Sequence, residues 1–548
     1  MGFKDNYISW LESQAVDDRT KEELKAIAND QKEIEDRFYK NLSFGTGGLR
    51  GIMGAGTNRM NVYTVRKATQ GLAEEILSNG REFAEKGVVI AYDSRNNSER
   101  FAYECSRVLC ANGIKTYIFD SLRPTPELSF AVRYLGCARG IVITASHNPK
   151  EYNGYKVYGK DGGQIAPETA EIILGFIDGI NIFDDVKTVD KPDNIVIGEE
   201  VDRAYIDAVK AQSCKTSIPE EFKVVYTPLH GSGNLLVRRV LCEIGVKNVF
   251  TVPEQEKPDG DFPTVNSPNP ENSEAFDIAV EYAAKQNADI VFGTDPDSDR
   301  LGVVVRNAAG EYVVLNGNQT GCLLCEYILR KSKQNGTLIE DGAVIKTIVT
   351  TETVRAIAQA YGAETIDVLT GFKFIGDKIK GFEDSGRADR FIFGLEESYG
   401  YLKGTYARDK DAVVAAMLIC EAAADYKAKG MTLYEGLQAI YEKYGYSVEK
   451  LKTITLKGID GAEQIKKLMS RFRNEKLPID TVKKLDYLEG IDGLPKSDVL
   501  KFFTPNGWFA VRPSGTEPKI KFYFGAHGNT MQAAQAELEK LLSVVEGL

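Results

Sequence analysis

Hydrophobic and polar positions divide the chain into a helical start, a long alternating region and a differently patterned end. Residues up to Tyr39 have the charged, amphipathic periodicity of helices. After them, short runs rich in β-branched and aromatic residues alternate with helical stretches, and this alternation starts again near Phe222 and near Ala343. Strands that alternate with helices predict parallel α/β units, so we expect three successive α/β blocks of similar plan.

The last part of the chain has a different pattern. Several apolar runs are typical of paired strands, and Asn506-Gly507 between two of them is a strong hairpin signal. An amphipathic helix is expected from Met531 to Val545. The predicted fold class is therefore α/β, with three similar α/β domains that contain mixed or parallel sheets and a C-terminal α+β domain with an antiparallel sheet.

Domain junctions are expected near residues 210, 320 and 445. The first domain, residues 1–210, would contain the N-terminal helices and a loop with a candidate nucleophilic serine. The second, 211–320, would contain an acidic loop, and the third, 321–445, a loop with two glutamates. The fourth, 446–548, would contain a loop with an arginine and two hydroxyls.

Composition and charge narrow the range of partners. Of the 548 residues, 43% are hydrophobic and 27% are charged, as in ordinary globular proteins. The net charge of −11 argues against binding nucleic acid or an anionic membrane over the whole surface, although it allows a small basic pocket. No signal peptide or membrane span is recognisable, so we expect a cytoplasmic protein that binds neither nucleic acid nor membrane.

Histidine and cysteine limit the possible metal sites. Three histidines are too few for motifs built on several of them. The pair Cys322 and Cys325 could be a redox or zinc pair, but no second such pair accompanies it, and its helical surroundings favour two small core residues.

The first polar loop of interest is the segment 144–149, which follows an apolar run. Ligands of open α/β sheets gather at the carboxyl ends of strands, so its position is informative. Ser146, beside His147, could be an exposed nucleophile. The alternative is a turn in which Ser146 or Asn148 caps neighbouring backbone amides.

The second loop contains three aspartates at alternate positions, Asp295, Asp297 and Asp299. Carboxylates spaced in this way can converge on one hard divalent cation, and without a counter-charge they would repel one another. An EF-hand is excluded because Arg300 and Arg306 occupy the positions where its glycine and glutamate are required. Oxygen-only ligands without a bidentate glutamate favour Mg²⁺ over Ca²⁺ or Zn²⁺. A nucleophilic aspartate pair of the haloacid-dehalogenase type is an alternative, although Asp299 occupies the place where that motif usually has threonine. A solvated acidic turn is another alternative.

The third and fourth loops suggest recognition of a sugar and of a phosphate. Glu396 and Ser398 could bind sugar hydroxyls, or they could belong to a charged strand-to-helix turn. The segment 512–518 combines an arginine, two hydroxyls and a glycine, which could enclose a phosphate, or it could be a plain hairpin turn. Together the four loops fit phosphoryl transfer to or from a polyol.

These four loops, in this order, resemble those of the α-D-phosphohexomutases. The resemblance extends over nearly the whole chain, from Phe44 to Pro518, and also includes the segments 92–95, 124–127 and 227–231. It implies four domains around a central cleft and an Mg²⁺-dependent isomerase that transfers a phosphoryl group within a sugar phosphate.

The resemblance also implies a role for individual residues. Ser146 would be the phosphorylated serine, and its phosphate would hold Mg²⁺ together with Asp295, Asp297 and Asp299. The cations and proton-transfer groups around the reacting phosphoryl group would be Arg50, His147 and Lys156. The residues that bind substrate would be Arg300, Lys373, Glu396, Ser398, Lys410, Arg512, Ser514, Gly515 and Thr516.

The third loop bears on the choice of sugar. The run from Leu395 to Ser398 resembles that of glucose-type enzymes more than that of glucose/mannose enzymes, and pentose-type relatives tend to lack Ser398. We therefore expect interconversion of glucose 1-phosphate and glucose 6-phosphate through glucose 1,6-bisphosphate, by a monomer or homodimer. A pentose or mannose phosphate remains an alternative substrate, and a non-catalytic protein that binds sugar phosphates is a further one.

Overall fold

The computed structural model describes residues 2–45, 47–456, 458–491, 493–513 and 519–546. These residues form two compact units. Unit 1 comprises Met1–Ser213, Ile218–Val304 and Gly404–Cys420, and unit 2 comprises Cys214–Ser217, Val305–Lys403 and Glu421–Leu548.

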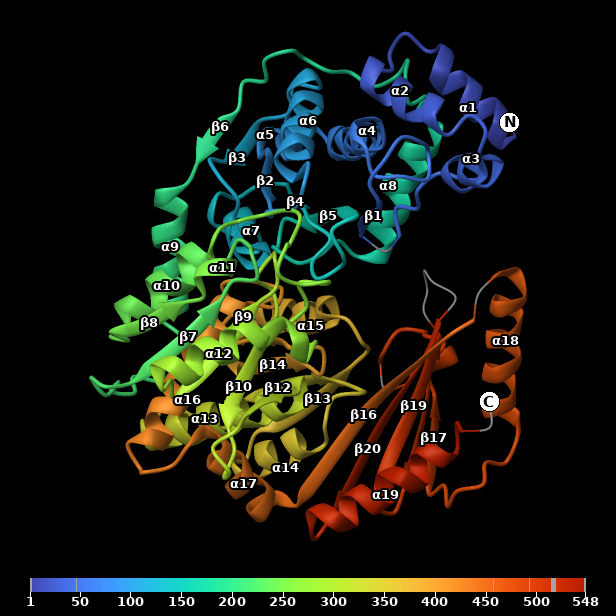
Figure 1. Ribbon diagram of the computed structural model, residues 1–548. Helices are drawn as coiled ribbons and strands as arrows, with labels where there is room; N and C mark the ends of the chain where they lie inside the picture. The colour runs from blue at the N-terminus through green and yellow to red at the C-terminus, as the bar shows by residue number, and fades with distance from the viewer. Residues whose placement is uncertain (1, 46, 457, 492, 514–518, 547–548) are drawn as a thin grey trace. The chain divides into compact units, whose positions relative to one another are not determined.

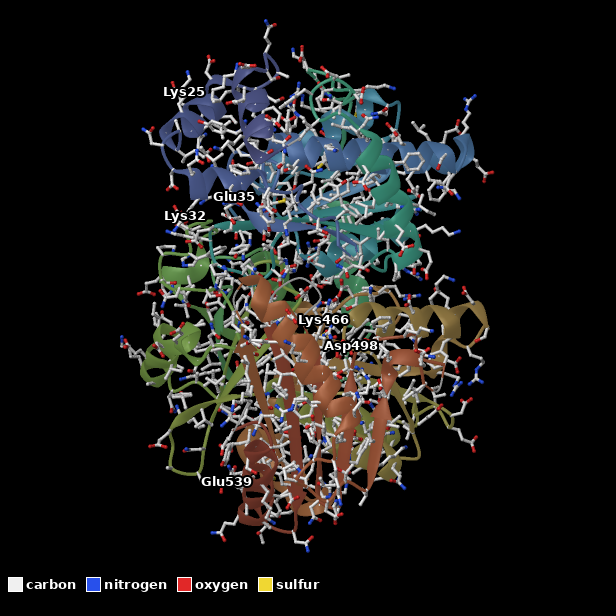
Figure 2. All side chains as sticks on the ribbon, turned by 90° about the vertical axis from the view of Figure 1, so that its right-hand side faces the viewer. Lys25, Lys32, Glu35, Lys466, Asp498 and Glu539 are labelled. Atoms are coloured by element: carbon white, nitrogen blue, oxygen red, sulfur yellow. The ribbon has the colours of Figure 1, made fainter. Side chains whose placement is uncertain are left out.

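The chain begins with three short amphipathic helices, as the sequence predicts. Their bounds are α1 Phe3–Glu12, α2 Asp18–Ala26 and α3 Gln31–Phe38. Leu24 and Phe38 are fully buried, whereas the charged side chains of Lys25, Lys32 and Glu35 are exposed (Figure 2). The periodicity that predicted these helices therefore corresponds to one face turned to the core and one turned to solvent.

The first sheet has the strand order β1-β5-β4-β2-β3-β6. The strand bounds are β1 Gly48–Ile52, β2 Val88–Tyr92, β3 Thr116–Phe119, β4 Arg139–Ile143, β5 Tyr152–Gly159 and β6 Ile195–Ile197. The helices are α4 Val62–Ser78, α5 Arg81–Glu85, α6 Ser98–Ala111, α7 Thr125–Tyr134, α8 Pro167–Gly179 and α9 Glu199–Lys210. Strands β4, β2, β3 and β6 pair in parallel, and β5 pairs antiparallel with both β4 and β1. The continuous apolar run of β2 fits its position, since all of its residues are buried.

The second sheet has the order β11-β10-β9-β7-β8. The strands are β7 Lys223–Thr227, β8 Asn248–Thr251, β9 Ile290–Thr294, β10 Leu301–Arg306 and β11 Tyr312–Leu315, and the helices are α10 Asn234–Glu243, α11 Pro253–Glu256 and α12 Asp277–Gln286.

The third sheet has the order β13-β12-β14-β15. Its strands are β12 Ala343–Thr347, β13 Glu364–Val368, β14 Phe391–Glu396 and β15 Gly400–Leu402, and the helices of this region are α13 Gly317–Gln334, α14 Thr353–Ala360, α15 Phe372–Asp384, α16 Ala412–Lys427 and α17 Leu433–Tyr444.

The fourth sheet is antiparallel throughout and has the order β16-β20-β19-β18-β17 (Figure 1). The elements are β16 Tyr446–Thr455, β17 Lys483–Asp486, β18 Leu500–Thr504, β19 Gly507–Pro513, β20 Lys519–Gly528, α18 Gly458–Asn474 and α19 Met531–Ser543. Successive residues of β19 point to opposite faces. Phe509 packs with residues of α18 and α19, whereas Trp508 and Ala510 pack with Ile348 and Val349.

The predicted fold class is confirmed by these four sheets. The first three mix parallel and antiparallel strands and the fourth is antiparallel, and the hairpin at Asn506-Gly507 joins β18 to β19. Cys322 and Cys325 are both buried on α13, as expected of core residues. Among the described residues, none of the helices combines the length and apolar character needed to cross a membrane.

Candidate active site

The three α/β sheets place their polar loops in the same way. In each, a central parallel strand ends in a loop and the chain returns as an antiparallel strand: β4 to β5, β9 to β10 and β14 to β15. Each loop contains one non-glycine residue with a positive φ: Ser146 at 53°, Ser298 at 51° and Tyr399 at 66°. This conformation is disfavoured for side chains with a Cβ and persists only where the surroundings hold it, so each of these loops is held in place by its neighbours.

Ser146 lies in the loop between β4 and β5, and its side chain meets the acidic loop. Its hydroxyl donates a 2.8 Å hydrogen bond to Asp295 Oδ2 and lies 3.1 Å from His147 Nδ1. Ser146 is 4% exposed. A hydroxyl between a carboxylate and an imidazole nitrogen can lose and regain its proton locally, as a phosphoryl acceptor must.

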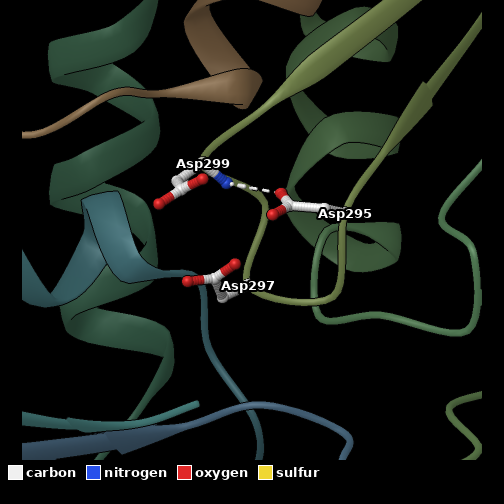
Figure 3. A group of neighbouring side chains, drawn as sticks. All are labelled: Asp295, Asp297 and Asp299. Atoms are coloured by element: carbon white, nitrogen blue, oxygen red, sulfur yellow. Dashed lines mark hydrogen bonds between the residues drawn. The ribbon is translucent and has the colours of Figure 1, made fainter. Parts of the chain in front are cut away.

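The three aspartates form the turn of the β9–β10 hairpin. Their carboxylates surround one space, and the ligand oxygens all lie within 4.8 Å of one another (Figure 3). Asp295 Oδ1 accepts hydrogen bonds from the backbone N–H groups of Asp299 and Arg300, at 3.1 and 3.0 Å, which close the turn. All three carboxylates are buried.

Two lysines partly offset this buried negative charge. Lys156 Nζ lies 2.9 Å from Asp297 Oδ2, and Lys410 Nζ lies 3.0 Å from Asp299 Oδ2. Burial and then the charges of the other two aspartates raise the pKa of Asp295 well above its ordinary value. Burial acts in the same sense on Asp297, but the charge and hydrogen bond of Lys156, together with hydrogen bonds from Asp295 and Thr125, lower the pKa of that carboxyl overall.

The acidic hairpin also meets the chemical requirements of a divalent cation site. Among the described residues, Asp297 Oδ1 and Asp299 Oδ1 are buried and have no hydrogen-bond partner. Buried carboxylate oxygens normally have partners, and here two such atoms belong to one cluster of three converging carboxylates, where they are available to coordinate a cation. Three carboxylate groups are a ligand set that Mg²⁺ accepts.

The other cations predicted for the reacting end lie around the serine loop. Arg50 Nη1 donates to Asn148 Oδ1 at 3.3 Å, and Arg300 forms an ion pair with Glu271. Burial, followed by the charges of Arg300 and Arg50, holds the pKa of His147 well below its ordinary value, so its ring is neutral near pH 7.

Unit 2 contains the residues predicted for the sugar and for the second phosphate. Glu396 Oε1 accepts a 2.8 Å hydrogen bond from the backbone N–H of Gly371, just before Lys373 at the start of α15. Ser398 is partly exposed in the β14–β15 loop. Arg512 lies near the end of β19 and acts electrostatically on Tyr523, as do the two glutamates of the third loop. Ser514, Gly515 and Thr516 lie outside the described residues.

The structure therefore brings two groups of predicted residues together, one within each unit. In unit 1 these are Arg50, Ser146, His147, Lys156, Asp295, Asp297, Asp299, Arg300 and Lys410. In unit 2, Glu396 and Arg512 both act electrostatically on Tyr523, and Lys373 and Ser398 lie two positions along the chain from Gly371 and Glu396, which are joined by a hydrogen bond.

Some neighbours of the site were not identified from the sequence. Thr125 Oγ1 donates to Asp297 Oδ2 at 2.8 Å, and Ser267 Oγ donates to the backbone oxygen of His147 at 2.7 Å. The segments 92–95 and 124–127 contributed to the family resemblance, but no role was assigned to Thr125 or Arg95. The resemblance of these two segments to the family therefore marked them as informative, but the sequence does not indicate which atoms Thr125 and Arg95 contact.

Comparison with known proteins places the whole chain in one family. The profile for "Phosphoglucomutase/phosphomannomutase, alpha/beta/alpha domain I" matches residues 41–181, domain II matches 203–310, domain III matches 316–444 and the C-terminal domain matches 461–540. A phosphoglucomutase from Staphylococcus epidermidis is 37% identical over 541 residues, which cover 95% of this chain and 96% of that protein. A phosphoglucomutase from Staphylococcus saprophyticus is 38% identical over 517 residues, covering 90% of this chain and 92% of that one.

Solved structures share the fold at lower sequence identity. A putative phosphomannomutase from Thermus thermophilus has a TM-score of 0.69 at 23% identity, covering 92% of this chain and 99% of that one. The exocytosis-sensitive phosphoprotein pp63/parafusin from Paramecium has a TM-score of 0.70 at 18% identity, covering 92% and 95%. The full-length relatives and the four matched domains establish that the chain belongs to the phosphoglucomutase/phosphomannomutase family.

Proposed function

We propose that this protein is an Mg²⁺-dependent phosphohexomutase that interconverts glucose 1-phosphate and glucose 6-phosphate. The observation that carries the proposal is the contact between Ser146 Oγ and Asp295 Oδ2, which joins a nucleophilic hydroxyl to a triad of buried carboxylates. The similarity to phosphoglucomutases over nearly the whole chain supports glucose as the sugar.

The reaction consists of two phosphoryl transfers. In the first, the bond between phosphorus and Ser146 Oγ breaks as phosphorus bonds to the free hydroxyl oxygen of the sugar, and the hydroxyl proton passes to a protein base. The product is glucose 1,6-bisphosphate, which turns round in the site. In the second transfer, the bond between the other phosphorus and its sugar oxygen breaks as that phosphorus bonds to Ser146 Oγ, and the protein base returns its proton to the sugar oxygen. This regenerates the phosphoserine and leaves the isomeric monophosphate.

The residues around Ser146 are suited to this chemistry. His147 is within proton-transfer distance of Oγ, and Arg50, Lys156 and Arg300 provide positive charge for the phosphoryl oxygens. Asp295, Asp297 and Asp299, together with the seryl phosphate, would hold Mg²⁺. When bound, this ion neutralises charge that develops on the phosphoryl group.

The other predicted residues would recognise the rest of the substrate. Glu396, fixed by the Gly371 amide, and Ser398 would bind sugar hydroxyls. Arg512, with Ser514, Gly515 and Thr516, would hold the phosphate that is not reacting, and Lys373 and Lys410 would add charge. We further propose that the domain junctions lie near residues 210, 320 and 445.

Purified protein tests the proposal in a coupled assay. Glucose 1-phosphate, Mg²⁺ and catalytic glucose 1,6-bisphosphate are supplied, and glucose 6-phosphate is measured by its oxidation. Ser146→Ala removes the acceptor oxygen and is expected to lower kcat by roughly 10⁴-fold or more. Ser106→Ala, at a buried serine whose hydroxyl donates to Tyr103 on the same helix, is the matched control and should stay active.

Three outcomes would contradict parts of the proposal. Full turnover by Ser146→Ala would exclude the phosphoserine route. Unchanged rates after chelation of divalent cations and gel filtration would exclude the metal. Faster turnover of ribose 1-phosphate or mannose 1-phosphate than of glucose 1-phosphate would replace the substrate and leave the chemistry unchanged.

A further inference from the structure

The guanidinium group of Arg95 lies inside the loop that contains Ser146. Its Nη2 donates to the backbone oxygens of Ser146, at 2.6 Å, and of Asn148. Its Nη1 donates to the backbone oxygens of Pro149 and Tyr152, at 2.9 and 3.2 Å. One side chain thus binds four carbonyl groups in the turn between β4 and β5.

Asp93 connects the same guanidinium to the other end of the loop. Its Oδ2 lies 3.3 Å from Arg95 Nε and accepts a 2.7 Å hydrogen bond from the hydroxyl of Thr144. That hydroxyl in turn accepts a 2.8 Å hydrogen bond from the backbone N–H of Ser146. The backbone N–H and C=O of the serine are therefore both held, directly or through Thr144, by one buried ion pair.

The environment of Arg95 excludes solvent. The side chains of Arg95 and Asp93 have no exposed surface, and the ring of Phe262 covers the guanidinium, with its centroid 5.0 Å away. Burying an ion pair this completely is unfavourable unless further hydrogen bonds compensate it. Here the compensating bonds go to the loop carbonyls, so the energy of the ion pair is coupled to the conformation of that loop.

We propose that Arg95, supported by Asp93, is a positioning residue that fixes Ser146 for phosphoryl transfer. This inference rests on the proposed function. Ser146 has a φ of 53°, a conformation that its neighbours must maintain. In the observed arrangement the four carbonyl bonds and the Thr144 bridge maintain it, and they direct Oγ toward Asp295 and His147.

The position requires an arginine because the acceptor oxygens are arranged to match the planar guanidinium group. Two guanidinium nitrogens donate to four oxygens while the third faces Asp93. A lysine would keep the charge but would present a single nitrogen, which cannot reach the same set of acceptors. Arg95→Lys should therefore loosen the serine and leave the surfaces that bind the sugar unchanged.

The test compares Arg95→Lys with Arg139→Lys. Arg139 is also buried, pairs with Glu75 at 2.5 Å and stacks over the ring of Phe83 with its centroid 4.8 Å away, but none of its described hydrogen bonds reaches the serine loop. Both variants are assayed 10 °C or more below their own unfolding midpoints. We expect Arg95→Lys to lower kcat by about 100-fold with little change in KM, since misplacing a reacting atom by about 1 Å has an effect of this size. Arg139→Lys should keep kcat at a similar loss of thermal stability.

A second pair of variants covers the case in which Arg95→Lys does not fold. Thr144→Val removes the hydroxyl between Asp93 and the N–H of Ser146, whereas Thr144→Ser keeps it. The valine variant should lose kcat and the serine variant should regain most of it. A kcat within twofold of the parent in both Arg95→Lys and Thr144→Val, or equal losses in Arg95→Lys and Arg139→Lys, would overturn the inference. An inactive parent protein would instead overturn the proposed function.

Discussion

Two buried charge clusters, one in each unit, differ in how completely their charges are satisfied. In the acidic hairpin of unit 1, formed by Asp295, Asp297 and Asp299, two buried carboxylate oxygens have no hydrogen-bond partner among the described residues. In unit 2, a lysine cluster surrounds Glu352. Lys346 Nζ and Lys501 Nζ lie 3.2 and 3.0 Å from its Oε1.

The two ammonium groups of the lysine cluster have protein partners in addition to Glu352. Lys346 Nζ also donates to the backbone oxygens of Thr347 and Thr350, at 3.3 and 3.2 Å, and lies 3.1 Å from Asp367. Lys501 Nζ donates to the backbone oxygen of Ile348 at 2.6 Å. Asp367 Oδ1 accepts no hydrogen bond, but it has the Lys346 ammonium as its counter-charge, so each carboxylate of this cluster has a lysine beside it.

The comparison distinguishes a ligand site from a structural one. Both clusters bury charge, so burial alone does not identify function. A buried carboxylate oxygen without a hydrogen bond occurs in both clusters, so the difference lies in the balance of charge. Two lysines pair with the three carboxylates of the acidic hairpin, whereas two lysines pair with two carboxylates in the lysine cluster. Removing a carboxylate should therefore have different consequences in the two clusters. In the acidic hairpin it should lower activity, and in the lysine cluster it should lower stability.

The largest effect is expected from Asp295→Asn in the acidic hairpin. The amide keeps an oxygen for the N–H groups of Asp299 and Arg300, but it removes one metal-binding charge. We expect kcat/KM to fall by about 1,000-fold or more, the size seen when electrostatic stabilisation of a transition state is lost. The coupled assay with Mg²⁺ measures it.

The same variant should not be less stable in the absence of metal. It removes one of three like charges in a buried turn, so its unfolding midpoint in EDTA should equal or exceed that of the parent. The rise in midpoint that Mg²⁺ gives the parent should be smaller or absent. A lower midpoint in EDTA together with near-normal activity would show that the carboxylates are structural.

A smaller effect, on stability, is expected from Glu352→Gln in the lysine cluster. This change leaves Lys346 and Lys501 buried with one anion fewer. Breaking a wholly buried pair costs about 3–5 kcal/mol, and Glu352 is 31% exposed, so we expect a loss of about 2 kcal/mol in urea unfolding. Activity of the folded protein should change far less than in Asp295→Asn.

The matched control is Glu489→Gln. Glu489 pairs with Lys496 at 2.9 Å, but both side chains are more than 70% exposed. Such pairs contribute between zero and about 1 kcal/mol, so the control should hardly change stability. Equal losses in the two variants would mean that the lysine cluster is no more than a surface ion pair.

The sequence predicted the acidic hairpin but not the lysine cluster, for a physical reason. Three aspartates at alternate positions are local in sequence and follow an apolar strand, so their convergence can be inferred. Glu352 and Lys501 are 149 positions apart, and Lys346 lies within an otherwise apolar strand. Nothing local indicates that they meet.

The contacts of Arg95 could not be predicted for a similar reason. The segment around it contributes to the family resemblance, but its hydrogen bonds go to backbone carbonyls, which every residue possesses. The succession of strands and helices along the chain and the fold class could be predicted because periodicity is a local property. Contacts from a side chain to a distant backbone could not, because they depend on the tertiary structure.

The smallest effect we predict is a dependence of stability on pH that arises from Lys501. Burial, and then the charge of Lys346, lowers the pKa of Lys501 from 10.5 to about 8, despite the opposing effect of Glu352. Between pH 8 and 10.5 the unfolded chain holds a proton that the folded chain lacks, so this group makes the protein more stable as pH rises. The gain between pH 7 and 9 should be about 1 kcal/mol. Lys501→Met lacks the group, so urea unfolding of the two proteins at pH 7, 8 and 9 should give a stability difference, parent minus variant, that grows by that amount. Parallel profiles would indicate that the cluster keeps Lys501 charged up to pH 9, so that its two lysines balance its two carboxylates over the whole range.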